Sequence, residues 1–241
     1  MPKRSSVDPR SRIIEVASQL LREQGRVAVT TRRVAELASV QAPVIYRLFG
    51  DKDGLLDAVA EQVMAEFTAA KTAAASSSAE SGDDPIASLR AGWDMTIGFG
   101  LANPELFVLL SDPARTGHSP SAEAGLRVLG ERVHRVAMTG RLRVSEQQAV
   151  ELIHAAGTGA VLAILGRPEP DRDLGLADIL FDALCQRILT TEHPTADAPD
   201  GVGAEVAPAV ALRASVGDLD VLSAGERTLF AEWLDRIVEH G

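Results

Sequence analysis

Cysteine and aromatic residues are scarce in this sequence of 241 residues. Cys185 is the single cysteine, so no disulfide can form within the chain and small disulfide-stabilised folds are excluded. The most apolar stretch, residues 155–166, is too short and too rich in glycine for a membrane span, which needs about 20 residues. Residues 1–6 lack the apolar stretch of a signal peptide, so we expect a cytoplasmic protein without a membrane partner. Because 46% of the residues are hydrophobic, a globular core is expected.

Motifs that carry enzyme chemistry are also absent. The sequence has no phosphate-binding glycine motif, no helical pair of histidines with a glutamate, no pair of cysteines two residues apart and no serine nucleophile motif. Its five histidines lie on separate predicted elements. We therefore predict no catalytic residue, no metal site and no cofactor.

Charge is distributed unevenly along the chain. The net charge is −10, but residues 1–52 contain ten Lys or Arg and five acidic residues, and so carry +5. The remaining residues contain 14 basic and 29 acidic side chains, and so carry −15. A basic N-terminal part joined to an acidic body is typical of a DNA-binding domain attached to a domain that does not contact DNA.

Residues 41–49 are predicted to form a short helix with two different faces. One face is apolar and should be buried: Ile45, Leu48 and Phe49. The other combines a ring, a cation and two small apolar groups, a mixture suited to phosphates, thymine methyl groups and base edges: Pro43, Val44, Tyr46 and Arg47. A plain surface helix is the alternative for these nine residues alone.

A second short helix precedes this one. Thr30 is a good N-cap for a helix ending near Ala38, in which Val34, Leu37 and Ala38 should be buried. Only residues 39–41 remain between the two helices, which is the spacing of a helix-turn-helix motif.

The residues from Thr30 to Ala38, followed by Val40, Pro43, Ile45, Tyr46, Phe49, Lys52 and Leu55, resemble the DNA-binding domain of the TetR family of bacterial transcriptional repressors. The resemblance covers residues 10–60. It implies that Thr31 and Arg32 touch phosphates or a base at the groove edge and that Lys52 contacts phosphate. On the outer face of the helix at residues 41–49, we expect Tyr46 and Arg47 to contact bases or backbone. Gln41, Pro43 and Val44 should then supply base-edge and methyl contacts.

Two positions depart from the family pattern. Ser39 replaces the glycine that is usual in the turn, at an energetic cost if its φ is positive. Gln41 replaces a serine that often caps the recognition helix, and is a poorer cap.

The rest of the sequence predicts an all-α fold, and the resemblance implies that the helix-turn-helix domain is followed by a larger helical ligand-binding and dimerisation domain. Four parts are expected: a DNA-binding domain at 1–52, a connecting helix and loop at 53–84, an effector-binding and dimerisation domain at 85–190, and a linker with an amphipathic C-terminal helix at 191–241. The first helix should end at Gly25 and the connecting helix near residue 70, followed by a connection or a frayed helix end. Residues 192–208 should form a linker, and the C-terminal helix should dock on the body of its own chain or its partner.

Candidates for an effector pocket inside the helical body are mostly apolar, although each could equally belong to an ordinary core: Trp93, Phe99, Phe107, Met138, His154 and Phe181. We therefore expect a small-molecule effector that is apolar rather than highly charged. Gly157 and Gly159 are costly inside a predicted helix, so close approach of another helix should compensate them. The resemblance suggests a homodimer that pairs through the helices near 145–165 and 175–190.

These observations predict a dimeric, ligand-responsive repressor that binds double-stranded DNA at a palindromic operator. The alternative is a small helical enzyme or protein-binding module whose basic head has no DNA function. Sequence-specific binding to DNA would separate the two.

Overall fold

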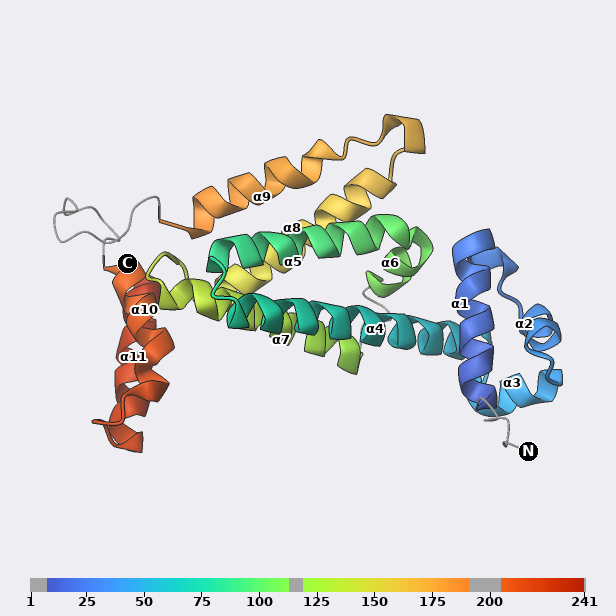
Figure 1. Ribbon diagram of the computed structural model, residues 1–241, viewed down its shortest axis with the longest axis horizontal. Coiled ribbons are helices and arrows are strands. Elements are labelled where there is room, and N and C mark those ends of the chain that lie inside the picture. The colour runs from blue at the N-terminus through green and yellow to red at the C-terminus, as the bar shows by residue number, and fades with distance from the viewer. Residues whose placement is uncertain (1–7, 113–118, 191–204, 241) are drawn as a thin grey trace. The chain divides into compact units, whose positions relative to one another are not determined.

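The computed structural model describes residues 8–112, 119–190 and 205–240, which form helices joined by turns (Figure 1). The helices are α1 (Pro9–Ala28), α2 (Thr31–Ala38), α3 (Ala42–Phe49), α4 (Lys52–Glu80), α5 (Pro85–Ala102), α6 (Pro104–Leu110), α7 (Pro120–Met138), α8 (Glu146–Leu165), α9 (Gly175–Ile188), α10 (Val206–Ser215) and α11 (Ala224–His240). Extended pairing within the described ranges is limited to an isolated bridge between Leu142 and Leu189. The predicted all-α class is confirmed.

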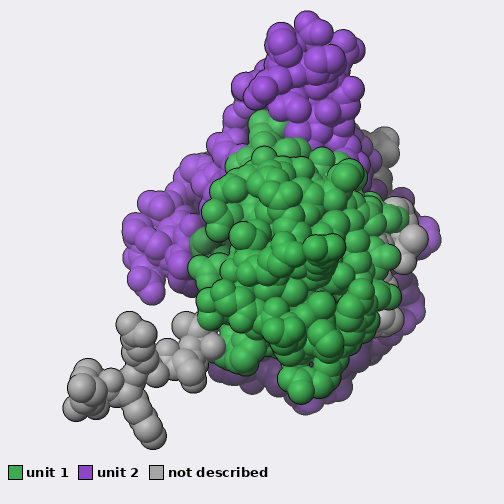
Figure 2. Space-filling view, turned by 90° about the vertical axis from the view of Figure 1, so that its right-hand side faces the viewer, with its two compact units in different colours: residues 1–70, 99–124 green, residues 71–98, 125–241 purple. Residues whose placement is uncertain are grey.

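The chain divides into two compact units, drawn in green and purple in Figure 2. Unit 1 consists of residues 1–70 and 99–124, and unit 2 of residues 71–98 and 125–241. Helices α4, α5 and α7 each contribute residues to both units. The backbone therefore passes from one unit to the other along continuous helices.

The core of unit 1 is built from the apolar stripes of its first four helices and from α6. Fully buried side chains on α1 to α4 include Ile13, Val34, Ile45, Leu55 and Leu56. Within a helix the buried residues recur at intervals of three and four and so lie on one side, as Ile13, Ala17 and Leu20 do on α1. Each such side chain contributes roughly 1.5–3 kcal/mol by leaving water, so this core can hold the short helices α2 and α3, which would be unstable alone.

One helix boundary and one side chain in unit 1 test the predictions. Gly25 has φ 75° and ψ 175°, which interrupts the helical backbone of α1 where the sequence predicted its end. The prediction that Leu37 is buried is wrong, because 54% of this residue is exposed. The residues of α2 that face the core are Val34, Ala35 and Ala38.

Two predicted connections are partly helical. The prediction that residues 71–84 form a connection or frayed end is wrong up to Glu80, where α4 ends. Alanine is the best helix former, and the alanine-rich sequence continues the helix without an apolar period. The predicted linker at 192–208 is also wrong at its end, because α10 begins at Val206. Pro208 is tolerated there because it lies in the first helical turn. Residues 191–204 lie outside the described ranges.

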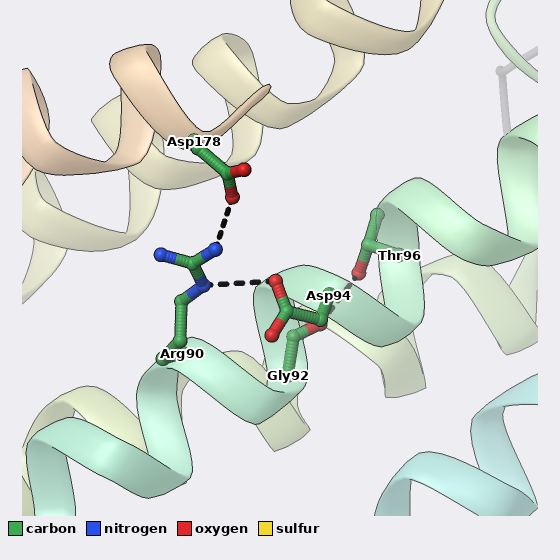
Figure 3. A network of polar contacts seen from close by, with 5 residues as sticks. All are labelled: Arg90, Gly92, Asp94, Thr96 and Asp178. Carbon is green, nitrogen blue, oxygen red and sulfur yellow. Dashed lines mark hydrogen bonds and ion pairs between the residues drawn. The ribbon is translucent and has the colours of Figure 1, made fainter. Parts of the chain in front are cut away.

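In unit 2, polar and aromatic contacts join α5 to α9. The guanidinium of Arg90 donates to Asp94 on its own helix (2.9 Å) and to Asp178 on α9 (Figure 3). Its Cζ atom also lies 5.0 Å from the ring centroid of Phe181. The Phe181 ring in turn packs against Trp93, with 5.4 Å between centroids.

The two glycines of α8 have different surroundings. A Cβ atom at Gly157 would lie 3.4 Å from the Trp93 ring, so a side chain, rather than the backbone of another helix, packs closely there. A Cβ atom at Gly159 would have no described atom within 4 Å. Within the described residues, α8 is the helix that is long and apolar enough to cross a membrane by length and composition, a test that core helices also pass.

The C-terminal residues form a helical hairpin. Leu234 of α11 packs with Ala209 of α10 and Val216 of the following turn. A capping box begins α11, because Ser223 and Glu226 exchange hydrogen bonds between side chain and backbone N–H. Helix α11 thus packs against α10, a helix that was not predicted from the sequence.

Candidate nucleic-acid interface

The turn between α2 and α3 is built on a left-handed residue. Ser39 has φ 56° and ψ 42°, and its N–H donates to the carbonyl of Glu36 at 3.2 Å. The next N–H, of Val40, donates to the carbonyl of Ala35 at 3.0 Å. Both bonds satisfy carbonyls at the end of α2, so the chain reverses within three residues. At the other end of α2, Thr30 accepts a hydrogen bond from the N–H of Arg33, as predicted for an N-cap.

Helix α3 presents a polar face outward. Ile45 is fully buried, whereas 53% of Tyr46 is exposed and Arg47 is also exposed. Gln41 and Pro43 are exposed as well, and Gln41 makes no capping hydrogen bond. Val44 differs from its predicted place on the outer face, because it is half-buried and packs against the unit 1 core.

Gly54 fixes the end of α3 against the start of α4. A Cβ atom at this position would lie 2.1 Å from the carbonyl oxygen of Phe49, the last residue of α3. Asp51 accepts a hydrogen bond from the N–H of Gly54 at 2.8 Å and so caps α4. The position of α3 therefore depends on a residue without a side chain, and we did not predict this role from the sequence.

The N-terminus of α2 lies beside α3 and is rich in cations. The hydroxyl groups of Thr31 and Tyr46 lie 3.2 Å apart, within hydrogen-bonding distance. Arg32 is exposed and pairs with Glu36 at 3.1 Å, an interaction worth less than about 1 kcal/mol at a surface. Arg33 is exposed too, and the first turn of α2 contains no acidic residue. An anion at this helix end would be stabilised by the helix dipole and by both arginines.

Two further cations lie in unit 1 near the ends of α3 and α4. The Cζ atom of Arg10 is 5.6 Å from the centroid of the Phe49 ring. Lys52 donates from Nζ to the carbonyl oxygen of Arg26 at 3.1 Å. This bond holds the ammonium group at the start of α4 and leaves it two other N–H donors.

The predicted effector residues fall into different units. Trp93 and Phe181 are in contact in unit 2, where His154 and Met138 also belong. In unit 1, Phe99 stacks on Phe67 with 4.1 Å between centroids, and Phe107 is buried.

A buried cation in unit 2 was missing from the predicted sites. Arg132 is 2% exposed, and it occupies a position in the apolar stripe of α7 that also contains Val133 and Val136. The sequence signal for this buried cation is an arginine at a position of α7 where the apolar spacing predicts a core residue. Among the described residues, no group of three or more His, Cys, Asp or Glu side chains is placed to hold a metal ion.

Comparison with known proteins agrees with this geometry. The sequence pattern of the bacterial regulatory proteins of the tetR family matches residues 13–59, which run from α1 into α4. The helix-turn-helix part of the chain is therefore of the tetR type.

TetR-family relatives include the HTH-type transcriptional regulator BetI of Stenotrophomonas maltophilia, which is 38% identical over 93 residues. These residues are 38% of this chain and 45% of that protein, so the chain spans about half the length of this relative.

Solved TetR-family structures share the fold over most of the chain. A TetR-family transcriptional regulator from Pectobacterium atrosepticum superposes with a TM-score of 0.65 at 19% identity, covering 78% of this chain and 99% of that one. The Thermus thermophilus FadR, a TetR-family transcriptional repressor in complex with lauroyl-CoA, has a TM-score of 0.60 at 20% identity, covering 80% of this chain and 100% of that one.

Proposed function

We propose that this protein is a ligand-responsive transcriptional repressor that binds a palindromic operator as a homodimer in the cytoplasm. The observation that carries the proposal is the exposed polar face of α3, held by a tight turn beside the cationic start of α2. A short helix held in this way can enter the major groove while the helix before it contacts the backbone.

The DNA contacts that we propose follow from exposure and chemistry. Arg47 and Tyr46 reach bases or phosphates, and Gln41 supplies amide donors and acceptors to base edges. Pro43 and the exposed part of Val44 contact thymine methyl groups. Phosphate contacts come from Thr31, Arg32 and Lys52 at the two neighbouring helix starts, where backbone N–H groups also favour anions.

We propose that two copies pair through α8 and α9. A third of the most apolar window of α8 is buried within one chain, although its mean hydropathy is 1.5. Apolar side chains remain exposed on both helices, including Leu162 (38%) and Ile179 (63%). Ala155, Gly159 and Ala163 add small exposed residues at four-residue intervals on α8, which lets a second helix approach closely. Burial of this surface in a dimer would bring two α3 helices to one DNA duplex.

The FadR neighbour is in complex with lauroyl-CoA, and by analogy we propose that unit 2 of this protein binds an effector. Effector binding favours a conformation in which the two α3 helices no longer match successive major grooves, which lie about 34 Å apart. Helix α4, which begins beside α3 and ends in unit 2, is the mechanical link.

Selection of bound sequences from a random pool of DNA duplexes tests this function. We expect enrichment of an inverted repeat whose half-sites have centres separated by about one helical turn or a multiple of it. Recovery of unrelated sequences, or binding that is equal for all sequences, would contradict the proposal. The same duplex, measured against protein concentration, then gives the number of chains bound.

A further inference from the structure

Unit 2 contains a buried guanidinium that has no counter-charge among the described residues. Arg132 donates from Nη2 to the carbonyl of Lys71 at 3.3 Å. Its Nε and Nη1 atoms are buried, and they have no hydrogen-bond partner within the described part of the chain. The ion pairs found among the described residues do not include Arg132. A buried charge in this state is strongly destabilising unless an anion pairs with it.

The guanidinium lies against the backbone of α5 at Gly92. A Cβ atom at this position would be 1.7 Å from Nη1 and 2.9 Å from Cζ of Arg132. Any other residue at position 92 would therefore displace the guanidinium from its present place. Glycine inside a helix costs about 1 kcal/mol relative to alanine, and here it gives the buried cation room.

A second cation reaches the same turn of α5. Thr96 donates from its hydroxyl group to the carbonyl of Gly92 at 2.9 Å (Figure 3). The same hydroxyl oxygen accepts from Nζ of Lys71 at 3.4 Å. Lys71 and Arg132, from α4 and α7, thus meet on one turn of α5.

The two cations influence each other. Burial and the charge of Arg132 lower the pKa of Lys71 to about 8, while burial and the charge of Arg135 lower the pKa of Arg132. Partial burial and the charge of Lys71 also lower the pKa of His154 on α8. Basic side chains from three helices, α4, α7 and α8, therefore converge in unit 2, and a bound anion would offset the repulsion between the charges of Arg132, Lys71 and Arg135.

We propose that Arg132 and Lys71 bind the carboxylate of a small effector whose body is apolar. This inference rests on the proposed function and names the chemical class of its effector. It refines the expectation of an effector that is apolar rather than highly charged, because Arg132 and Lys71 add cationic anchors to pocket candidates that are mostly apolar.

The surroundings favour a singly charged head on an apolar body. Trp93 follows Gly92 directly, is 4% exposed, and packs its ring against Phe181 and Gly157. Its Nε1 atom is buried and has no hydrogen-bond partner among the described residues, so it is a further donor for an oxygen. A carboxylate loses less hydration than a doubly charged phosphate when it enters such surroundings.

Thermal unfolding of the full-length protein tests the site without DNA. We would compare 4-phenylbutyrate with its neutral isostere 4-phenylbutanamide, and with inorganic phosphate at equal ionic strength. We expect 4-phenylbutyrate to raise the Tm by about 5 °C or more at a concentration 100 times its Kd, and the other two compounds to give no comparable rise.

Substitutions then locate the binding. Arg132→Met keeps an unbranched apolar stem and removes the charged guanidinium, and should abolish the shift while leaving the Tm of the unliganded protein equal or higher. Gly92→Ala, which retains the arginine, should weaken binding of 4-phenylbutyrate at least tenfold. Arg127→Met, an exposed arginine on the same helix, is the matched control and should keep the full shift.

Several outcomes would overturn the proposal: no shift in the wild type, an equal shift with the amide or with phosphate, or a shift that Arg132→Met retains. A lower Tm of unliganded Arg132→Met, together with no carboxylate-specific shift, would assign Arg132 a structural role instead. Failure of the proposed function is separable. Binding of 4-phenylbutyrate that does not release the selected operator would leave the carboxylate site in place and remove its role as an effector site.

Discussion

Single residues set the geometry of the α2–α3 motif, and two of them do so through their backbone. Ser39 holds the left-handed conformation at the turn, and Gly54 allows the carbonyl of Phe49 to touch the first turn of α4. Tyr46 and Arg47 can face outward because Ile45 between Val44 and Tyr46 is anchored in the core. Substitutions at positions 39 and 54 should therefore have opposite effects.

Replacement of Ser39 by glycine should stabilise unit 1. A left-handed backbone costs an L-residue roughly 1–2 kcal/mol, and glycine removes most of this cost. We expect Ser39→Gly to raise the free energy of unfolding by about 0.5–1 kcal/mol in urea denaturation, with unchanged operator affinity. A decrease in stability would mean that the serine side chain makes a compensating interaction.

Replacement of Gly54 by alanine should displace α3. A Cβ atom 2.1 Å from a backbone carbonyl oxygen cannot be accommodated unless the backbone moves. We expect a loss of at least about 1–3 kcal/mol of stability and a large loss of operator affinity, measured by urea denaturation and fluorescence anisotropy. Gly50→Ala lacks such a contact but has φ 81°, so its effect on stability should come from backbone strain alone. Equal operator affinity for Gly54→Ala and the wild type would refute the close contact.

Lys71 should make stability depend on pH. Its pKa is about 8 in the folded chain and near 10.5 when unfolded, so the unfolded chain binds more protons between these values. The free energy of unfolding should therefore gain a positive slope from about pH 8 to 10.5, and the destabilisation from the protonated amine should be fully present below pH 8. Urea denaturation of wild type and Lys71→Met across this range gives the contribution by difference. An identical slope in both proteins would contradict it.

At the scale of helices, strong local signals predicted elements well, and neutral sequence did not. The cap at Thr30 was predicted correctly, because a side-chain oxygen near a free N–H is a local effect. The continuation of α4 to Glu80 was not predicted, because its alanine-rich sequence has no apolar period from which to infer a helix. The start of α10 was not predicted, because Pro208 stands among its buried residues and is typical of a linker. In such segments the helix propensity of the residue types decides whether a helix forms.

Only the part of the candidate site that depends on local sequence could be predicted. The outward direction of Tyr46 and Arg47 follows from helical spacing within eight residues. The role of Gly54 and the contact of Arg132 with Gly92 depend on chain segments that meet in three dimensions. No spacing rule within one helix reveals such contacts.

The apolar outer surface of α8 and α9 should hold the dimer together. Ile179 is 63% exposed on α9, and a charge there would be buried without a partner in the proposed interface. We expect Ile179→Glu to convert the dimer to monomers in sedimentation velocity, with an unchanged circular dichroism spectrum. Val221→Glu, at a side chain that is 88% exposed outside both helices, should remain dimeric. Monomers from both variants, or dimers from both, would exclude α8 and α9 as the specific interface.

For the whole molecule, charge separates the DNA-binding part from the rest. Residues 1–52 carry +5 and the remainder −15, so the acidic part is repelled by DNA and favours binding through α2 and α3. Binding should weaken steeply with salt, because each neutralised phosphate releases counterions. Arg47 on the exposed face of α3 is the residue whose removal should change both affinity and this salt dependence.

The most direct test is operator affinity of Arg47→Ala as a function of salt concentration. We expect weaker binding, by about 1–3 kcal/mol if Arg47 contacts a base, and a slope of log K against log salt that is about one unit shallower if it contacts phosphate. Arg167→Ala, an exposed arginine outside unit 1, should match the wild type. An Arg47→Ala protein that binds the operator with wild-type affinity and wild-type salt dependence would contradict the assignment of α3 as the DNA-reading helix.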